Sequence, residues 1–488
     1  MRWIWLFFVV LPISPAQTLR ARIESALEAS PAAKRAFWGI QVVKIASGET
    51  VFQLNAERLF VPASNTKLFT TALALQRLGP DYRFETTIRA DAPPDASGRV
   101  IGDLRLVGGG DPLLSGRAVP YQKGAAAGNP LQAIEALADQ VLAAGVRRID
   151  GDIVGDDTAY VWAPYPEGWA QDDAVWDYGA PVSALAVGDN VVTLALRGSG
   201  AAGRAPALFL SPPLEYYFID NRVRTGLGLA NKVAIERLAG SRQLRLWGTL
   251  SSGPAGAVAL AVAIDDPALY AAWALTDALE RRGVQIGGRP VARHWYANQA
   301  GPAPAPEGVA LARRSSPPLI EILRIIDKVS QNLYAEMVLR EVGRARQGTG
   351  SREAGLVEER EFLAESGIAE TGYHFADGSG LSPNGLATPA ALTRLLRAMY
   401  RSPVREAWIS LLPVGGEDGT LAGRFGGRPA AHRIRAKTGT HTHVAALSGY
   451  IESRSHGELA FSILANNFQA PASEIRAVID RIALLLAE

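Results

Sequence analysis

The feature that most constrains the fold is a helix-and-strand pattern that stops near residue 84 and resumes near residue 308. Before the break, two strand-like segments precede a helix predicted over residues 65–78, whose apolar side chains recur every three or four residues. After residue 308 the helical period returns, and three strands and an amphipathic helix at 474–487 close the chain. One mixed α and β module is therefore predicted from two separate chain segments.

The residues in between, 84–307, are typical of a β-rich block. Short alternating segments such as GDLRLVGG are separated by Gly, Pro and Asp clusters, and helices are expected at 131–144 and 268–281. A chain of 488 residues is also too long for one core. The predicted fold class is α/β (α+β), with a main domain in two parts, 17–83 and 308–488, and one or more β-rich domains inserted between them.

The first 16 residues, MRWIWLFFVVLPISPA, predict a secretory signal peptide cleaved after Ala16. The apolar stretch is shorter than the roughly 20 residues that span a bilayer as a helix. The chain has no cysteine, which excludes a lipid-anchored N-terminus, disulfides and a thiolate nucleophile. The mature protein is predicted to be periplasmic, or peripheral to the membrane if the segment is retained.

The charged residues argue against a nucleic-acid partner, and few of the basic ones are lysine. Fifty basic and 48 acidic residues leave a formal charge of +2 without long runs of either sign, so no nucleic-acid partner is expected. Only seven of the basic residues are Lys and 43 are Arg. A desolvated Lys can lose its proton and act as a base, whereas Arg stays protonated.

Ser64-Asn65-Thr66-Lys67 is a candidate nucleophile and base at the start of the first apolar helix. A spacing of three places the Ser64 and Lys67 side chains on one helix face. Burial would lower the pKa of Lys67, so that its neutral amine could take the Ser64 proton. The alternative is a helix-capping Ser beside a Lys whose charged end reaches solvent.

Lys437-Thr438-Gly439-Thr440 lies on a predicted strand. A cation beside a hydroxyl can hold a substrate carboxylate, the glycine lets a ligand backbone approach, and the following amide can point at an oxyanion. The alternative is an ordinary edge strand that ends in a bulge.

Ser330-Gln331-Asn332 opens a further predicted helix. Ser330 could relay a proton to a leaving group, and Asn332 could hydrogen-bond a substrate amide. The alternative is a simple helix cap.

In this order, the three motifs resemble the S-x-x-K, S-x-N and K-T-G motifs of the penicillin-recognising serine enzymes. The separation of Ser64 and Ser330 is far longer than β-lactamases use. Short sequence segments spread over nearly all of the mature chain narrow the resemblance further: PASNTK, LVGGGDP, YGAPVSAL, SSPPLIEILR, SQNLYAE, DGSGLS, GEDGTL, RAKTGT and ANNF. Together they resemble the D-Ala-D-Ala carboxypeptidase/endopeptidase family (class C penicillin-binding proteins of the PBP4 type, peptidase family S13). That family carries β-rich domains inserted after the first catalytic helix, so the two-part domain would be the catalytic domain.

The resemblance implies a penicillin-binding-protein/β-lactamase-like transpeptidase fold and an acyl-enzyme mechanism without metal or cofactor. Its partners would be peptidoglycan stem peptides and, as covalent inhibitors, β-lactam antibiotics. The catalytic residues would be Ser64 as nucleophile and Lys67 as base, with Ser330 and Asn332 completing the cleft wall. Lys437 and Thr438 would bind the substrate's terminal carboxylate, and the amides of Ser64 and Thr440 would form the oxyanion hole. Gly439 completes the substrate-binding motif.

Four positions bear on how this chain recognises its substrate. Asp157 resembles a position that contacts the amine of the substrate's diamino acid, and we expect it in a loop of the inserted block. Pro383 stands just after the Asp377–Gly380 loop, where family members often have a basic residue. His441 and His443 stand where an apolar residue is usual, and we expect both on one face of a strand as polar residues at the cleft rim, because no third metal ligand is near.

Three rival functions remain open at this point. A Ser-His-Asp hydrolase is disfavoured because the chain has no G-x-S-x-G motif. A β-lactamase-like hydrolase would share the three motifs, but it needs a water molecule that hydrolyses the acyl-enzyme quickly. A non-catalytic peptidoglycan-binding scaffold would be expected to have lost at least one of the motif residues. The balance of carboxypeptidase and endopeptidase action, the preferred diamino acid and the oligomeric state are not predicted.

Overall fold

The computed structural model describes residues 18–125, 128–199, 202–238, 240–253, 255–299 and 303–488. The signal peptide predicted at residues 1–16 lies outside these ranges. None of the helices within them combines the length and the apolar character that crossing a membrane would require.

One five-stranded antiparallel sheet is built from both ends of the chain. The first strand pairs with the last, from Phe37 opposite Asn466 to Lys44 opposite Leu459. The sheet order is β19-β20-β21-β1-β2, with β1 (Phe37–Lys44), β2 (Thr50–Leu54), β19 (Ile434–His441), β20 (Val444–Ser453) and β21 (Gly457–Asn466).

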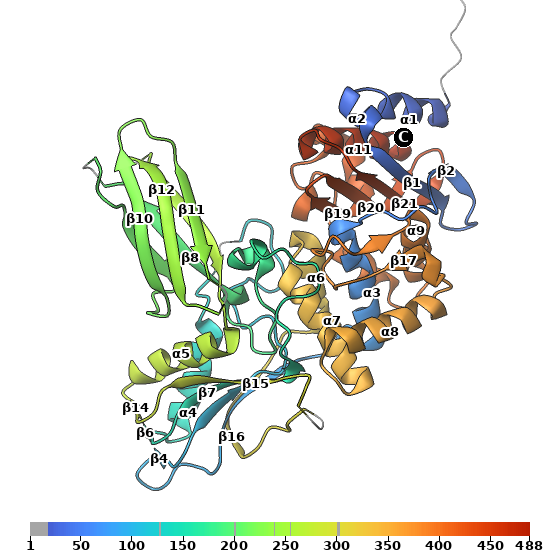
Figure 1. Ribbon diagram of the computed structural model, residues 1–488. Coiled ribbons are helices and arrows are strands. Elements are labelled where there is room, and N and C mark those ends of the chain that lie inside the picture. Colours follow the sequence, from blue (N-terminus) through green and yellow to red (C-terminus); the bar gives the residue numbers. More distant parts are fainter. Residues whose placement is uncertain (1–17, 126–127, 200–201, 239, 254, 300–302) are drawn as a thin grey trace, which may run out of the picture.

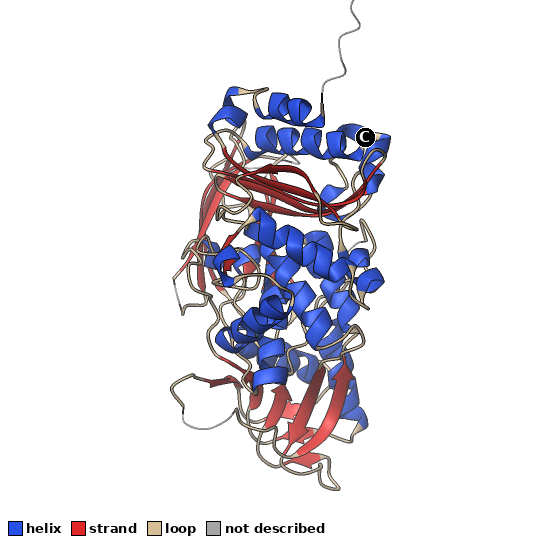
Figure 2. Cartoon of the chain, turned by 90° about the vertical axis from the view of Figure 1, so that its right-hand side faces the viewer, coloured by secondary structure: helices blue, strands red, loops and turns tan. Residues whose placement is uncertain are grey.

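Helices from the two chain ends cover one face of this sheet (Figure 2). Alternate residues of β1, such as Ile40 and Val42, are fully buried in the same apolar cluster as Ile475 and Ile479 of the last helix. The covering helices are α1 (Leu19–Leu27), α2 (Pro31–Arg35) and α11 (Ala472–Ala487).

A thicker helical layer lies on the other face, and α3 (Thr66–Arg77) runs through its middle (Figures 1 and 2). Every residue of α3 from Thr66 to Leu75 is buried, including its polar side chains. The helix is therefore enclosed on all sides and not on one apolar face alone. The helices that pack on α3 are α6 (Leu319–Val329), α7 (Asn332–Gln347) and α8 (Arg352–Glu365). The layer also contains α9 (Pro389–Tyr400), α10 (Arg405–Leu411) and the short strands β17 (Tyr373–His374) and β18 (Leu386–Ala387).

The middle of the chain forms the lower and left-hand parts of Figure 1 and has its own apolar cluster. Its larger sheet has the order β15-β7-β5-β3-β16 and a small one β14-β6-β4, packed with two helices. These elements are β3 (Glu85–Ala90), β4 (Arg99–Val100), β5 (Leu104–Val107), α4 (Gln132–Ala143), β6 (Arg148–Ile149), β7 (Ile153–Val161), α5 (Pro267–Glu280), β14 (Gln285–Ile286), β15 (Pro290–Trp295) and β16 (Val309–Ser315).

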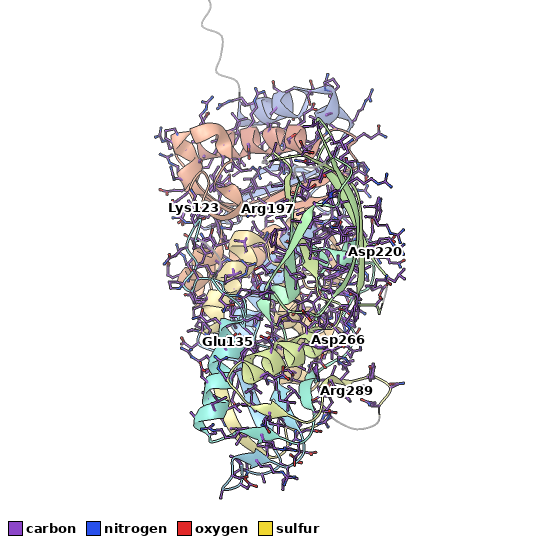
Figure 3. The ribbon with its side chains drawn as sticks, turned by 90° about the vertical axis from the view of Figure 1, so that its left-hand side faces the viewer. Lys123, Glu135, Arg197, Asp220, Asp266 and Arg289 are labelled. Atoms are coloured by element: carbon purple, nitrogen blue, oxygen red, sulfur yellow. The ribbon has the colours of Figure 1, made fainter. Side chains whose placement is uncertain are left out.

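Two three-stranded sheets, β10-β12-β11 and β13-β8-β9, form an arm beside the helical layer. Figure 3 shows Arg197 and Asp220 on this arm, above Glu135 of α4 and Asp266 at the start of α5. The strands of the arm are β8 (Val191–Arg197), β9 (Ala207–Ser211), β10 (Phe218–Gly226), β11 (Lys232–Arg237), β12 (Gln243–Ser251) and β13 (Ala257–Ala263).

Strand β16 begins just after residue 307, where the β-rich block is expected to end. Strand β16 pairs antiparallel with β3 over most of its length, and β15 pairs in parallel with β7. Sheet membership therefore extends the block to Ser315, and the chain re-enters the helical layer at α6.

Candidate active site

Ser64 lies in a short 3-10 turn, Ala63–Asn65, which leads directly into α3. The preceding residue, Ala63, has a φ of +48°, a left-handed conformation that non-glycine residues rarely adopt. A Cβ on Gly380 would lie 1.9 Å from the Ala63 carbonyl oxygen. The loop Asp377–Gly380 (the DGSG loop) therefore packs tightly against this turn. The strained, tightly packed turn holds Ser64 at the wall of a cavity.

Lys67 is fully buried and points at Ser64. Its Nζ lies 3.0 Å from Ser64 Oγ, 2.6 Å from Asn332 Oδ1 and 2.6 Å from the carbonyl oxygen of Ser379. These three acceptors come from three separate chain segments. The amine is therefore held in one position against the Ser64 hydroxyl.

Ser330 and Asn332 lie at the junction of α6 and α7. Ser330 has a φ of +63° and ends α6, Gln331 caps α7, and Asn332 is the first residue of α7. The SQN motif thus forms a sharp turn between two helices, where the sequence predicted the opening of one. Asn332 Nδ2 donates to the carbonyl oxygen of Tyr178 at 2.8 Å, which fixes its Oδ1 toward Lys67.

Lys437 extends from β19 and is also fully buried. Its Nζ donates to Ser330 Oγ at 2.8 Å and to the carbonyl oxygen of Thr438 at 3.0 Å. An ammonium has three N–H donors, so one donor remains beyond these two contacts. A Cβ on Gly439 would lie 2.6 Å from the Pro62 carbonyl oxygen, and the glycine therefore allows β19 to pack against the Ser64 turn.

Burial lowers the pKa of both lysines. Burial, and next the charge of Lys437, hold the pKa of Lys67 well below its usual value, although Asp377, Glu336 and Asp327 oppose this. Burial likewise lowers the pKa of Lys437. A lysine in this state can exchange a proton with a neighbouring serine near neutral pH.

Both serines open onto one cavity of about 780 Å³. Its wall also includes the end of β19, the DGSG loop and a loop of the β-rich block. The lining residues include Ser64, Ser330, Asn332, Thr440, His441, Gly380, Pro383, Tyr178, Asp172 and Asp173. Each of the three motifs therefore contributes at least one residue to the wall of this cavity: Ser64, Ser330 with Asn332, and Thr440.

Glu336, for which the sequence suggested no role, anchors the DGSG loop. Its Oε1 accepts from the amides of Gly378 and Ser379, each at 2.8 Å, and its Oε2 pairs with Arg340 at 3.0 Å. Asp377 accepts from the Trp169 indole at 2.9 Å and so ties the loop to the β-rich block. These bonds position the Ser379 carbonyl that contacts the base.

Asp157 does not line this cavity. It lies on strand β7 and not in a loop, and it is 1% exposed. Its Oδ2 accepts from Ser183 Oγ at 2.8 Å, and its Oδ1 lies 2.9 Å from Nδ1 of His294. The acidic residues that do line the cavity are Asp172 and Asp173, in a loop without periodicity that a sequence pattern could reveal.

His441 and His443 do not share a strand face. His441 ends β19 with its Nε2 3.2 Å from the Gly380 carbonyl oxygen, whereas His443 lies in the following turn with a φ of +62°. His443 Nδ1 lies 2.6 Å from the carbonyl oxygen of Phe468. Across the part of the chain that the structure describes, no three His, Cys, Asp or Glu side chains are grouped as metal ligands would be.

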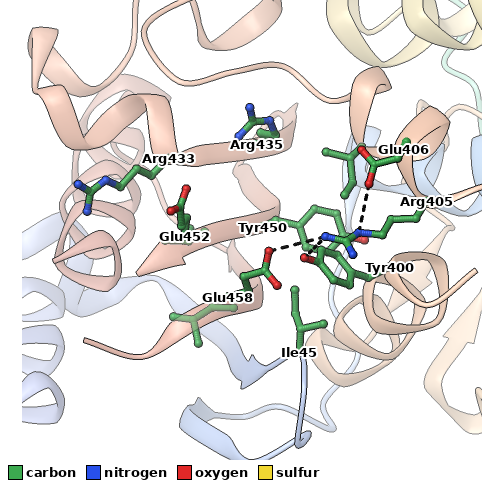
Figure 4. Close-up of a pocket in the computed structure, with 12 residues that line it drawn as sticks. Ile45, Tyr400, Arg405, Glu406, Arg433, Arg435, Tyr450, Glu452 and Glu458 are labelled. Carbon is green, nitrogen blue, oxygen red and sulfur yellow. Dashed lines mark hydrogen bonds and ion pairs between the residues drawn. The ribbon is translucent and has the colours of Figure 1, made fainter. Parts of the chain in front are cut away.

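A smaller cavity of about 250 Å³ lies at the opposite end of β19 (Figure 4). Arg405 contacts Glu406 at 3.6 Å and Glu458 at 3.8 Å, and its guanidinium lies 3.7 Å from the centre of the Tyr400 ring. The described residues that line it include neither serine nor lysine. This cavity lacks the groups for the chemistry that the larger one offers.

Comparison with known proteins places this geometry in a family. Over 481 residues the chain is 37% identical to the D-alanyl-D-alanine carboxypeptidase of Actinomadura sp. (strain R39), covering 96% of this chain and 84% of that one. Penicillin binding protein 4 (dacB) from Haemophilus influenzae has a similar fold, with a TM-score of 0.81, 21% identity, and coverage of 95% of this chain and 97% of that one. The same protein complexed with a novel β-lactam gives a TM-score of 0.76 at 20% identity, with coverage of 95% and 98%.

These matches agree with the family model whose description is D-Ala-D-Ala carboxypeptidase 3 (S13) family, which aligns with residues 19–488. The resemblance that the three motifs predicted is thereby confirmed, as is the mixed α and β fold class. The chain belongs to the D-Ala-D-Ala carboxypeptidase 3 (S13) family.

Proposed function

We propose that this protein is a serine D-alanyl-D-alanine carboxypeptidase that acts through an acyl-enzyme on Ser64. The observation that carries the proposal is that Ser64, Ser330 and Asn332 line one cavity. Behind its wall, the buried Lys67 lies 3.0 Å from Ser64 Oγ and the buried Lys437 donates to Ser330 Oγ at 2.8 Å. Membership of the S13 family, and the name of the 37% identical relative, agree with it.

Acylation begins with neutral Lys67, 3.0 Å from Ser64 Oγ, taking the hydroxyl proton. The Ser64 oxygen then forms a bond to the carbonyl carbon of the substrate's penultimate D-Ala, and negative charge moves to the carbonyl oxygen. The amides of Ser64 and Thr440 are the expected donors to that oxyanion. Lys437 and Thr438 would bind the terminal carboxylate, and Gly439 leaves room for the substrate backbone beside them.

Collapse of the intermediate breaks the peptide C–N bond, and the proton passes through Ser330 to the leaving amine, which departs as D-Ala. Water then attacks the ester carbonyl carbon and gives a proton to Lys67. The bond between that carbon and Ser64 Oγ breaks, and Lys67 returns the proton to Ser64 Oγ, 3.0 Å away, as the acid product leaves. A leaving amine that belongs to a cross-linked neighbouring peptide would make the same chemistry endopeptidase action. A β-lactam would acylate Ser64 in the same manner and keep its leaving group tethered, so the adduct would persist.

Asp172 and Asp173, and not Asp157, would bind the amine of the substrate's diamino acid. Both line the cavity beside the motif residues, and a carboxylate there attracts a cationic amine. Asp157, buried and bonded to Ser183 and His294, has no access to the same space.

We also infer a periplasmic location after removal of residues 1–16, and a catalytic domain built from the two ends of the chain. The five-stranded sheet, which joins β1 and β2 to β19–β21, supports this division. The β-rich part would be the insertion between them.

The test is to incubate the mature protein with benzylpenicillin and record its intact mass, with Ser64→Ala as the matched control. We expect an added mass equal to that of the drug in the wild type and none in the variant, and release of D-Ala from an N-acylated L-Lys-D-Ala-D-Ala peptide. An unmodified wild type with intact drug would favour the non-catalytic scaffold. An unmodified wild type with consumed drug would favour the β-lactamase-like hydrolase.

A further inference from the structure

A second and larger cavity, of about 970 Å³, adjoins the active-site cavity and has no role in the proposed mechanism. The two cavities share Ala170 and Asp172 as lining residues. The loop that carries these residues therefore separates the site of bond cleavage from a further space of the size that ligand pockets have.

Three parts of the chain meet around this second cavity. Trp162 follows β7 directly, a loop of residues 164–176 forms most of the wall, and β11 of the arm (Figure 1) closes another side. Arg237, at the end of β11, donates to the Ala174 carbonyl oxygen at 2.7 Å and to the Tyr217 hydroxyl at 3.1 Å. The arm and the loop are thus joined by hydrogen bonds at the edge of the cavity.

Aromatic side chains dominate the wall: Trp162, Tyr165, Trp169 and Trp176. The three tryptophans are partly exposed and Tyr165 is 40% exposed, so these rings are not absorbed into a core. One face of Trp162 stacks on the His294 imidazole, with 3.9 Å between the ring centres. The Trp162 ring is therefore held in place, and only its other face can meet a ligand.

The charged residues of the wall are three carboxylates and one guanidinium: Asp172, Glu236, Asp265 and Arg237. The excess of negative charge disfavours an anionic ligand. Arg237 already donates to oxygens of the protein, and Glu236 accepts from Arg245 at 2.7 Å. The wall thus offers aromatic faces together with hydrogen-bond acceptors, and suits a neutral ligand that is rich in hydroxyl or amide donors.

We propose that this cavity is a subsite for the sugar part of peptidoglycan and takes an N-acetylated amino sugar. This inference rests on the proposed function. A pyranose ring presents C–H groups on its faces, which pack on aromatic rings, and hydroxyl and amide groups at its edge, which hydrogen-bond with carboxylates. A stem peptide whose diamino acid lies at Asp172 continues away from Ser64, and its far end carries the sugar.

The experiment compares two substrates that share the stem peptide L-Ala-γ-D-Glu-L-Lys-D-Ala-D-Ala. In one the N-terminus is acetylated, and in the other it carries the N-acetylglucosamine–N-acetylmuramic acid disaccharide. We expect the wild-type kcat/KM to be about tenfold higher on the disaccharide substrate, through a lower KM at a similar kcat.

Trp162→Ala and Tyr165→Ala should each remove most of this preference. Both should leave kcat/KM on the acetylated peptide within about twofold of the wild type, because neither residue lines the active-site cavity. Tyr165→Ala decides the matter if Trp162→Ala does not fold, since Tyr165 is the more exposed of the two.

Trp247→Ala is the matched control and should keep the wild-type preference. Trp247 lies on β12 of the same arm, is 41% exposed and is not among the residues that line the cavity. A wild type without the preference, a preference that survives in both variants, or an equal loss on both substrates would overturn the inference.

Calorimetric titration of Ser64→Ala with N,N′-diacetylchitobiose measures sugar binding without turnover. We expect saturable binding that the Ser64→Ala, Trp162→Ala double variant has lost. Binding of cadaverine in place of the disaccharide would overturn the inference in favour of an amine site. A wild type that releases D-Ala from neither substrate fails the proposed function, whereas an active wild type with no preference and no chitobiose binding fails this inference alone.

Discussion

Replacing Glu336 by glutamine should destabilise the protein strongly, because this side chain compensates a buried charge. Glu336 is 0% exposed and its partner Arg340 is 1% exposed, with 3.0 Å between Oε2 and Nη1. Gln keeps the shape and can still accept from the Gly378 and Ser379 amides, so the change isolates the loss of the carboxylate charge. The Arg340 guanidinium then remains buried without the carboxylate that pairs with it.

The expected loss is about 3–5 kcal/mol of unfolding free energy, the usual cost of removing one partner of a buried ion pair. That is a large part of the roughly 5–15 kcal/mol by which native domains are stable. The activity should also fall, since the Ser379 carbonyl that contacts Lys67 is held by the same side chain.

Urea unfolding followed by circular dichroism measures the loss. Glu361→Gln on the exposed face of α8 is the matched control and should stay within about 0.5 kcal/mol of the wild type. In an Arg340→Met background, Glu336→Gln should cost far less, because no charge is then stranded. A loss below about 1 kcal/mol in the wild-type background would refute the reasoning.

Three further outcomes are expected. Lys67→Ala should lower the rate of acylation by benzylpenicillin by about 10²–10⁴-fold, as mass spectrometry over time would show, because the general base is lost; a near-normal rate would remove Lys67 from that role. Gly439→Ala should destabilise the fold by about 1–3 kcal/mol in urea unfolding, since its Cβ would lie 2.6 Å from the Pro62 carbonyl oxygen; an unchanged unfolding curve would contradict this contact. Hydrogen bonds to Asp157 and Asp266 outweigh burial and raise the pKa of His294 to about 9, so its stabilisation is complete below about pH 6.5 and is lost as pH rises through 9. The stability difference between wild type and His294→Gln should therefore be larger at pH 6 than at pH 10, and a difference independent of pH would argue against a charged imidazole.

Local periodicity explains why much of this architecture could be predicted. The Ser64–Lys67 spacing requires only one helical turn, and the two residues lie 3.0 Å apart. The helices expected at 131–144 and 268–281 correspond to α4 and α5 within one residue at each end. The family resemblance and the fold class are confirmed, whereas the catalytic roles stay predictions.

Long-range pairing explains what could not be predicted. The boundary near 308 fell before β16 because nothing local to Val309–Ser315 shows that its partner is β3, more than two hundred residues earlier. Asp157 and Asp172 both stand in acidic, turn-rich sequence, but β7 buries the first and an irregular loop brings the second to the cavity. Which carboxylate faces the substrate depends on how distant segments pack and on no pattern of neighbours.

Helix α6 shows the same limit within a single helix. The segment LIEILRIIDKV is an amphipathic pattern that, taken alone, would place Asp327 and Lys328 in water, yet they are 0% and 5% exposed. Charged residues remain buried where other charges compensate them, and here Lys437, Lys67 and Asp418 do so. The amphipathic pattern of one helix therefore does not reveal which of its polar residues other segments of the chain will bury.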